Sequence, residues 1–275
     1  INRMNPNGAY IRNKVPPTEV KQKTVAIIGA GLSGLAAAKA FSERGHKVLG
    51  YERHSDFGGV WDPERCYPDV QTQTSKTYYR FSDAPMPDSY PEWPKGTQVH
   101  RYFKKYAEKH SLIELFELGV DVEEMARRAG DKPGWTLTLK KDGKARKQDV
   151  DFVVIATGMF SHKNEITHEG QEEFVKQGGQ VIHSSDFLLP DMVQGKRVVV
   201  LGGAKSATDV AVSAANHGAE QVTWAYRKNI WRIPYYIGGI IKADILAGMR
   251  WWEHQLSPCR QTDMQRRITK LLKPV

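Results

Sequence analysis

The chain has 275 residues, of which 40% are hydrophobic and 26% charged, a composition that is ordinary for a globular protein of one or two domains. Its formal net charge is +9, but the basic residues are dispersed and no nucleic-acid-reading motif accompanies them, so we expect no nucleic-acid partner. The two cysteines, Cys66 and Cys259, form neither a disulfide framework nor a metal-ligand spacing, so we expect a cytoplasmic location and no metal.

Both ends of the chain are polar or basic. Residues 1–22 lack the apolar core of a signal peptide, and we expect an N-terminal extension there. The longest apolar stretch, residues 235–249, is too short and too often interrupted by charge to span a bilayer. Residues 251–272 could form a basic amphipathic helix that contacts a membrane, but we favour a solvated surface helix.

A strand–helix–strand pattern occurs twice. In the first copy, an apolar run at residues 23–28 precedes a glycine-rich turn, a helix-like segment at 35–41 and a second strand at 46–51. The second copy places a strand at 197–201, a helix at 206–217 and a strand at 221–226. Continuous apolar strands joined by helices are typical of parallel βαβ units.

The segment between the copies predicts mixed structure. We expect an irregular stretch at 63–95, a helix at 99–110, and an alternating strand at 135–139 with a hairpin turn at Asp142-Gly143. A buried strand is predicted at 150–156. The predicted fold is therefore α/β, with two Rossmann-like dinucleotide-binding domains, three layers and a β-meander excursion, and with boundaries at 23–190 and 191–275.

Residues 29–34 read G-A-G-L-S-G, the G-x-G-x-x-G pattern, after a strand and before a helix. The first glycine permits the tight turn, the second lets the backbone approach a pyrophosphate, and the third lets helix and strand pack closely. Glu52 lies 23 residues after Gly29 (52 − 29), where a carboxylate can accept hydrogen bonds from ribose hydroxyls. The turn alone does not distinguish FAD from NAD, and a glycine turn without a ligand remains the alternative.

Several later segments carry a family resemblance. Residues 57–61 read F-G-G-V-W, residues 81–85 read F-S-D-A-P, and residues 156–158 read A-T-G. Together they resemble elements of the class B flavin-dependent monooxygenases, in the N- and S-oxygenating branch. The family fingerprint F-x-G-x-x-x-H-x-x-x-F/Y is matched by Gly179, His183 and Phe187, whereas Phe174 lies three residues too early. Phe187 favours this branch over the Baeyer–Villiger branch, which has tryptophan there.

The resemblance implies FAD at the first glycine turn. Residues 72–76 read T-Q-T-S-K and resemble a Thr-Asn-x-x-Lys element whose asparagine lies beside the flavin, so Gln73 becomes the candidate catalytic residue. Its amide could hydrogen-bond a flavin peroxide without titrating; a polar loop residue is the alternative. The residues expected to contact FAD are Gly29, Gly31, Leu32, Ser33, Gly34, Glu52, Arg53, Gly59, Val60, Trp61, Gln73, Val120, Thr157 and Gly158.

The second glycine turn departs from the ideal pattern. Residues 202–207 read G-G-A-K-S-A, and Ala204 adds a methyl group where the backbone would approach a pyrophosphate. Arg227 lies 25 residues after Gly202 (227 − 202), and Lys228 follows it, so cations stand where a 2′-phosphate would lie. This favours NADPH over NADH. The residues expected to contact NADPH are Gly202, Gly203, Lys205, Ser206, Arg227 and Lys228.

The family resemblance implies a reaction in which NADPH reduces FAD, a hydroperoxyflavin forms with O2, and one oxygen atom passes to a nitrogen or sulfur nucleophile in a small molecule. The absence of a C-x-x-C motif argues against a disulfide reductase of the same fold. Members of the family are longer, and only 48 residues (275 − 227) follow Arg227, so the NADPH domain is expected to be incomplete. Two alternatives remain: a Baeyer–Villiger enzyme acting on ketones, and a truncated nucleotide-binding relative without turnover.

Overall fold

The computed structural model describes residues 21–128, 133–228, 235–237 and 241–242. Its contacts divide the chain into two units, one of residues 1–60 and 103–162 and one of residues 61–102 and 163–275. The predicted N-terminal extension, apart from its last two residues, and the predicted surface helix at 251–272 lie outside the described residues. Among the described residues, no helix combines the length and apolar character needed to cross a bilayer.

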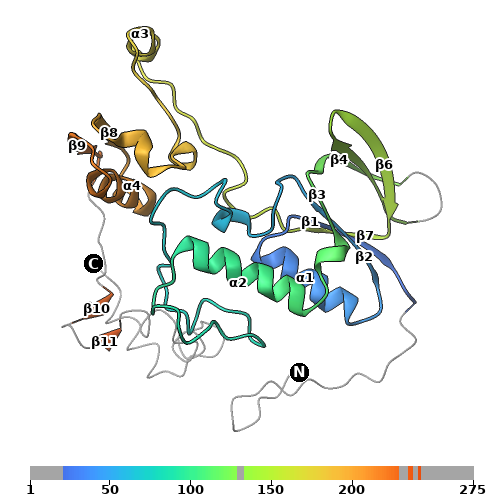
Figure 1. The fold of residues 1–275 in the computed structure, drawn as a ribbon. Coiled ribbons are helices and arrows are strands. Elements are labelled where there is room, and N and C mark those ends of the chain that lie inside the picture. The colour runs from blue at the N-terminus through green and yellow to red at the C-terminus, as the bar shows by residue number, and fades with distance from the viewer. Residues whose placement is uncertain (1–20, 129–132, 229–234, 238–240, 243–275) are drawn as a thin grey trace, which may run out of the picture. The chain divides into compact units, whose positions relative to one another are not determined.

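A four-stranded parallel sheet forms the centre of the first unit, with the strand order β3-β2-β1-β7 (Figure 1). Every pairing in it is parallel. Because a parallel sheet requires crossover connections, the helix between the first two strands follows from the topology. The elements of this part are β1 (Thr24–Ile28), α1 (Leu32–Ser42), β2 (Lys47–Glu52), η2 (Ile113–Leu115), β3 (Phe116–Leu118) and β7 (Phe152–Ile155).

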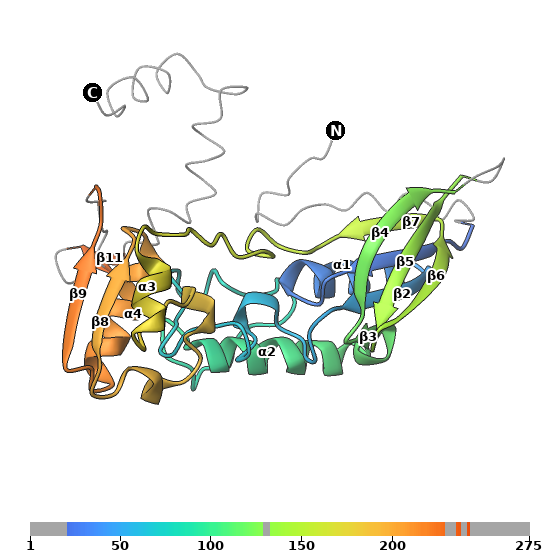
Figure 2. The same ribbon diagram turned by 90° about the horizontal axis from the view of Figure 1, so that it is seen from above.

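The sheet is covered on two faces. Val25, Ala26 and Ile27 of β1 are all buried, although successive strand residues point to opposite faces. Leu35 and Ala38 of α1 are buried on one face of the sheet, while Ala26 joins a cluster with side chains of the antiparallel sheet. The first unit therefore has the predicted three layers of helix, parallel sheet and antiparallel sheet (Figure 2).

The antiparallel layer is a meander of β4 (Asp121–Arg127), β5 (Trp135–Lys141) and β6 (Lys144–Val150). The hairpin predicted at Asp142-Gly143 is confirmed, with φ of +48° and +76° at the two turn residues. Positive φ at both central residues matches the right-handed twist of the flanking strands. Leu137 and Leu139 of β5 point inward and are almost fully buried.

The buried strand predicted at 150–156 is wrong in two respects. Val150 belongs to β6, and β7 begins only at Phe152, because Asp151 makes a turn in which both its N–H and its carboxylate bond to the backbone of Thr24. Within the described residues β7 is also an edge strand, so Phe152 and Ile155 are 56% and 59% exposed. An apolar run therefore does not by itself report burial on both faces.

The second unit contains the second βαβ pattern, with each element within two residues of its predicted bounds. β8 (Arg197–Leu201) and β9 (Gln221–Ala225) pair in parallel, and α4 (Lys205–Asn216) connects them. The irregular stretch predicted at 63–95 is confirmed, since it holds isolated bridges but no named strand or helix. The remaining elements are η1 (Gly59–Trp61), α2 (Gly96–Lys109), α3 (Gln171–Lys176), η3 (Ser184–Asp186), η4 (Pro190–Val193), β10 (Tyr236–Ile237) and β11 (Ile241–Lys242).

Candidate dinucleotide-binding sites

The first glycine turn joins β1 to α1. Gly29 has φ of +105°, and its N–H donates to the carbonyl of Tyr51 at the end of β2, at 2.8 Å. A Cβ on Gly34 would lie 1.8 Å from the carbonyl oxygen of Gly29, so only glycine allows the helix to approach the turn. The first and third glycines thus have the structural roles that the sequence pattern predicts.

Gly31 fills the middle position and differs from the other two. Its backbone is extended (φ −81°, ψ −169°), and it caps α1 without a side-chain hydrogen bond. A Cβ on Gly31 would come no closer than 3.6 Å to a protein atom, the Cα of Gly59. Protein packing alone therefore does not demand a glycine here, whereas close approach of a diphosphate to the helix N-terminus would.

Glu52 ends β2 and is 7% exposed. One carboxylate oxygen accepts from the N–H of Ala30 at 2.7 Å, and the other accepts from the N–H of His54 at 2.9 Å. Each oxygen retains capacity for a second donor. The carboxylate therefore fixes the glycine turn and remains able to accept a ribose hydroxyl. Val120 is beside it: its N–H donates to the carbonyl of Glu52, and its side chain is buried in the core.

The Gly-Gly element packs against the first glycine turn. The N–H of Gly58 donates to the carbonyl of Ala30 at 3.2 Å, and Gly59 adopts φ of +60° close to Gly31. Leu32, Ser33 and Val60 are exposed around this contact. The sequence placed these segments in one site, and the structure brings them together.

Arg53 has a contact that the sequence did not predict. Its guanidinium donates to the carbonyl of Ser161, in the loop that follows β7. The same loop carries Thr157 and Gly158, which are exposed, with Gly158 at φ of +77°. Arg53 therefore links the end of β2 to the A-T-G loop.

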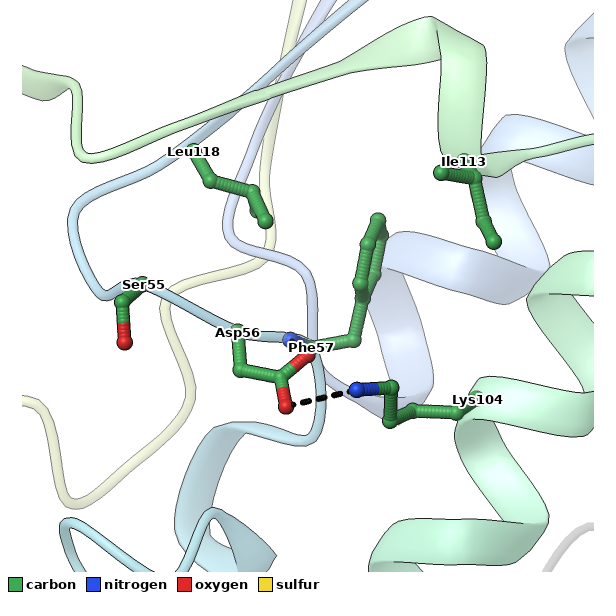
Figure 3. A pocket seen from close by; sticks show the side chains of 6 residues that line it. All are labelled: Ser55, Asp56, Phe57, Lys104, Ile113 and Leu118. Atoms are coloured by element: carbon green, nitrogen blue, oxygen red, sulfur yellow. Dashed lines mark hydrogen bonds and ion pairs between the residues drawn. The ribbon is translucent and has the colours of Figure 1, made fainter.

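A separate cavity of about 410 Å³ lies near the same end of the sheet (Figure 3). Lys104 and Asp56 form an ion pair of 2.9 Å at this cavity. None of the predicted cofactor residues lines it, so it is distinct from the glycine turn. The lining residues are Ser55, Asp56, Phe57, Lys104, Ile113 and Leu118.

Trp61 and Gln73 lie in the second unit. The indole N–H of Trp61 donates to the hydroxyl of Tyr79 at 2.7 Å, and the two rings meet edge to face. Burial raises the pKa of Tyr79. Gln73 is exposed. On either side of it, the backbone N–H groups of Thr72 and Lys76 donate hydrogen bonds to the carbonyls of Pro94 and Glu92.

The second glycine turn repeats the geometry of the first. Gly202 has φ of +134°, and its N–H donates to the carbonyl of Ala225 at the end of β9, at 2.9 Å. Ala204 caps α4 with φ −87° and ψ 179°, close to the conformation of Gly31. Because any L-residue can adopt this extended φ/ψ conformation, the alanine leaves the shape of the turn intact.

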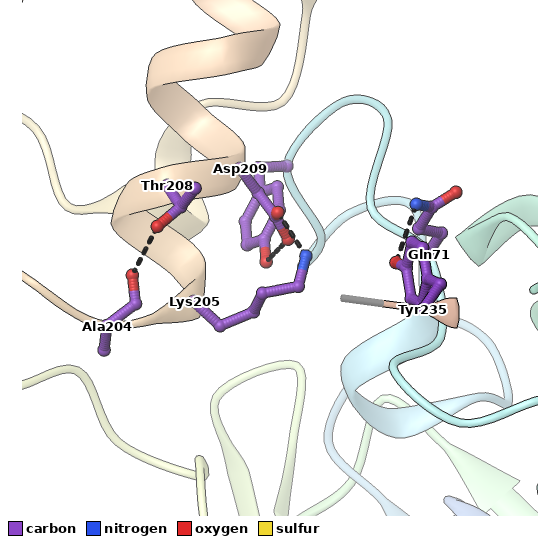
Figure 4. A network of polar contacts seen from close by, with 7 residues as sticks. Gln71, Ala204, Lys205, Thr208, Asp209 and Tyr235 are labelled. Carbon is purple, nitrogen blue, oxygen red and sulfur yellow. Dashed lines mark hydrogen bonds and ion pairs between the residues drawn. The ribbon is translucent and has the colours of Figure 1, made fainter. Parts of the chain in front are cut away.

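A polar network surrounds the start of α4 (Figure 4). Lys205 forms an ion pair with Asp209 one turn later, and the hydroxyl of Tyr67 donates to the other oxygen of Asp209 at 2.9 Å. Burial, followed by the charge of Asp209, raises the pKa of Tyr67, so it remains a donor. The i,i+4 spacing could have revealed the Lys205–Asp209 pair, but Tyr67 lies 142 residues from Asp209 and carried no local signal.

The two basic residues follow β9 after one intervening residue, Tyr226. Arg227 and Lys228 are exposed, and a Cβ on Gly203 would lie 3.1 Å from the carbonyl of Lys228. The basic pair and the second glycine turn are therefore neighbours, as the spacing predicts. Ser206 follows Lys205 in the first turn of α4 and interacts with the hydroxyl of Tyr67.

The fingerprint residues make local packing and capping contacts. The ring nitrogen Nδ1 of His183 accepts from the N–H of Ser185 and caps η3, while Phe187 is buried in the core. A Cβ on Gly179 would lie only 2.4 Å from the ring of Phe174. The displaced phenylalanine thus packs against the fingerprint glycine.

Two βαβ units, each with a glycine turn closed by the next strand, define a protein of the two-dinucleotide-domain α/β type. A family model described as "Flavin-binding monooxygenase-like" matches residues 22–252, and the chain belongs to that family.

Curated relatives include flavin-containing monooxygenase 5 of Cavia porcellus, 34% identical over 220 residues, and that of Homo sapiens, 33% identical over 239 residues. These matches cover 76% and 83% of this chain but only 41% and 44% of the relatives, so the chain spans less than half their length.

Among solved structures, Tmm from Pelagibacter sp. strain HTCC7211 matches with a TM-score of 0.67 and 26% identity, over 77% of this chain and 53% of that one. OTEMO, solved in complex with FAD and NADP, matches with a TM-score of 0.66 and 25% identity, over 77% of this chain and 40% of that one.

Proposed function

We propose that this chain binds FAD at the first glycine turn and NADPH at the second, as part of a monooxygenase that transfers one atom of O2 to a nitrogen or sulfur nucleophile. The proposed domains are residues 23–190 for FAD and 191–275 for NADPH. One observation carries the proposal: two turns of the same geometry are followed by opposite charges, Glu52 at the end of β2 and Arg227 shortly after β9.

The donors in the first turn fit FAD. Gly31 and Gly59 leave only backbone where the diphosphate would lie, and the N-terminus of α1 points its N–H groups there. Glu52 would accept the ribose hydroxyls with the capacity left on its carboxylate. Bound flavin would supply the oxygen-activating chemistry.

The second turn would bind the nicotinamide dinucleotide. Arg227 would bind the 2′-phosphate, since its guanidinium can donate two parallel hydrogen bonds to phosphate oxygens. Lys205 and Ser206 would supply donors to the diphosphate at the N-terminus of α4. Gln73 would donate a hydrogen bond to the bound flavin from its side-chain amide. The amide stays neutral at every working pH, whereas a histidine or a carboxylate would change its charge.

The N- and S-oxygenating branch is favoured by Phe187 and by the relatives. One relative at 32% identity is named dimethylaniline monooxygenase [N-oxide-forming] 2, from Macaca mulatta. Cyclohexanone and steroid monooxygenases also share the fold, at 24% identity. Ketone oxidation is therefore the second candidate, and nucleotide binding without turnover is the third.

The absorbance spectrum of the purified protein, with and without NADPH, tests the proposal. We expect flavin bands that bleach under NADPH. Protein that stays colourless after incubation with FAD would reject the cofactor assignment. NADPH oxidation with an amine, a sulfide and a ketone would then separate the candidates, and flavin reduction without any oxygenated product would favour binding alone.

A further inference from the structure

The ammonium group of Lys76 lies among three backbone carbonyls. It donates to Tyr90 at 2.7 Å, to Asp88 at 2.9 Å and to Pro87 at 3.3 Å. A lysine ammonium has three N–H donors, and the three carbonyls match that number. Hydrogen bonds from a charged donor are about twice as strong as neutral ones. Lys76 therefore holds these three backbone carbonyls together around one positive charge.

The segment that Lys76 binds cannot order itself through a regular ladder. Four prolines, Pro85, Pro87, Pro91 and Pro94, remove four backbone donors from ten residues (85–94). Their neighbours' carbonyls thus need donors from elsewhere, and Lys76 supplies three. A loop as long as the one between Trp61 and Gly96, without helix or strand, is usually functional or disordered.

Other contacts fix this loop at its base and near its middle. Gly96 N–H donates to the carbonyl of Val70 at 2.7 Å, which closes the base of the loop. The hydroxyl of Tyr102 accepts from the N–H of Phe81 and donates to the carbonyl of Ala84. Lys76 holds the turn at Pro87–Tyr90, between these two anchors, against the irregular stretch that carries Gln73.

We propose that Lys76 is a positioning residue: its ammonium folds the proline-rich turn at 87–90 onto residues 72–76 and so fixes the place of Gln73. The backbone contacts run from Thr72 to Pro94 and from Lys76 to Glu92, on both sides of Gln73. The amide of Gln73 is exposed, so its own side chain does not lock the loop. This inference rests on the proposed function only where it concerns the flavin.

The first arm of the test needs no cofactor. Lys76→Met keeps the aliphatic chain and removes the ammonium. In this variant we expect the rate of amide hydrogen exchange to rise by about tenfold or more at the backbone N–H groups of Tyr90 and of position 76. Lys76→Arg keeps the charge but not the compact three-donor geometry, and should recover only part of the protection. Lys105→Met, which removes an exposed lysine of α2, is the matched control and should exchange like the wild type.

The second arm uses the FAD-loaded protein and its visible absorption. If Lys76 positions Gln73, Lys76→Met should give the same difference spectrum as Gln73→Ala, and the double variant should add nothing. A purely structural lysine would lower the melting temperature and leave the flavin bands unchanged.

The outcomes separate the two claims. Wild-type exchange in Lys76→Met would overturn the inference whether or not the protein binds FAD. Raised exchange with an unaltered flavin spectrum, or a spectrum that Gln73→Ala leaves unchanged, would overturn the positioning role. A wild-type protein that takes up no FAD would reject the proposed function while the exchange arm still decides whether Lys76 orders the turn.

Discussion

The carboxylate of Glu52 accepts a hydrogen bond of 2.7 Å from the backbone N–H of Ala30, the residue between the first two glycines of the motif. Ala30 lies in the turn between β1 and α1, whereas Glu52 is the last residue of β2. The acid that would bind ribose thus also holds the turn that would bind diphosphate. Both functions depend on one buried side chain.

Glu52→Ala is expected to weaken FAD binding by about tenfold or more, because the Ala30 N–H loses its partner and an unpaired buried donor costs about 1–3 kcal/mol. Fluorescence titration of FAD would measure the change. Glu43→Ala, which breaks an exposed pair with Lys39, is the control and should bind like the wild type. Equal affinity in the Glu52 variant would contradict the assigned role.

Gly34→Ala is expected to destabilise the fold by about 3 kcal/mol, since the new methyl group would lie only 1.8 Å from the Gly29 carbonyl oxygen and the helix must shift. Urea unfolding would measure the loss. Gly45→Ala meets open space and carries only the backbone strain of its φ of +77°, about 1 kcal/mol. A smaller effect at Gly34 than at Gly45 would show that α1 does not sit so close to the turn.

Arg227→Ala is expected to raise the Kd for NADP+ by roughly 10- to 100-fold, the range for loss of a bidentate charged pair, and to leave the Kd for NAD+ nearly unchanged. Calorimetric titration of both dinucleotides would measure the difference. Arg197→Ala removes an exposed arginine at the start of β8 and controls for net charge. Parallel losses for both dinucleotides would remove the case for a 2′-phosphate contact.

Tyr67→Phe is expected to reduce the alkaline sensitivity of the fold. The pKa of Tyr67 is raised by burial and by Asp209, so the folded state retains the proton at a pH where the unfolded chain loses it. Its contribution to stability is complete below the unfolded pKa of about 10 and is lost as the pH rises through the folded value. Urea midpoints from pH 9 to 11 should fall less steeply in the variant; identical slopes would refute the coupling.

The sequence predicted the two βαβ units well because their signals are local. Three local signals indicate the same turn: an apolar run of five or six residues, glycines at fixed offsets, and a charge at the end of the next strand. The structure reproduces this for the first copy and, despite Ala204, for the second. In the meander, the sequence predicted one strand and the hairpin at Asp142-Gly143, but not the bounds of β4 and β6.

The contacts missed by the sequence are those made between distant segments. The bond from Arg53 to Ser161 spans 108 residues, and that from Tyr67 to Asp209 spans 142. No periodicity or spacing encodes such pairs. The prediction that β7 is buried was wrong for a related reason. Apolar composition is a local property, whereas the presence of a neighbouring strand is a property of the whole sheet.

The outer edge of β7 has a consequence for work in solution. Within the described residues its backbone N–H and C=O groups face no further strand, and Phe152 and Ile155 project beside them. Such an edge is a template for intermolecular strand addition. Light scattering as a function of protein concentration would measure such association, and Phe152→Lys is expected to reduce it, because a lysine beside a strand edge opposes strand addition.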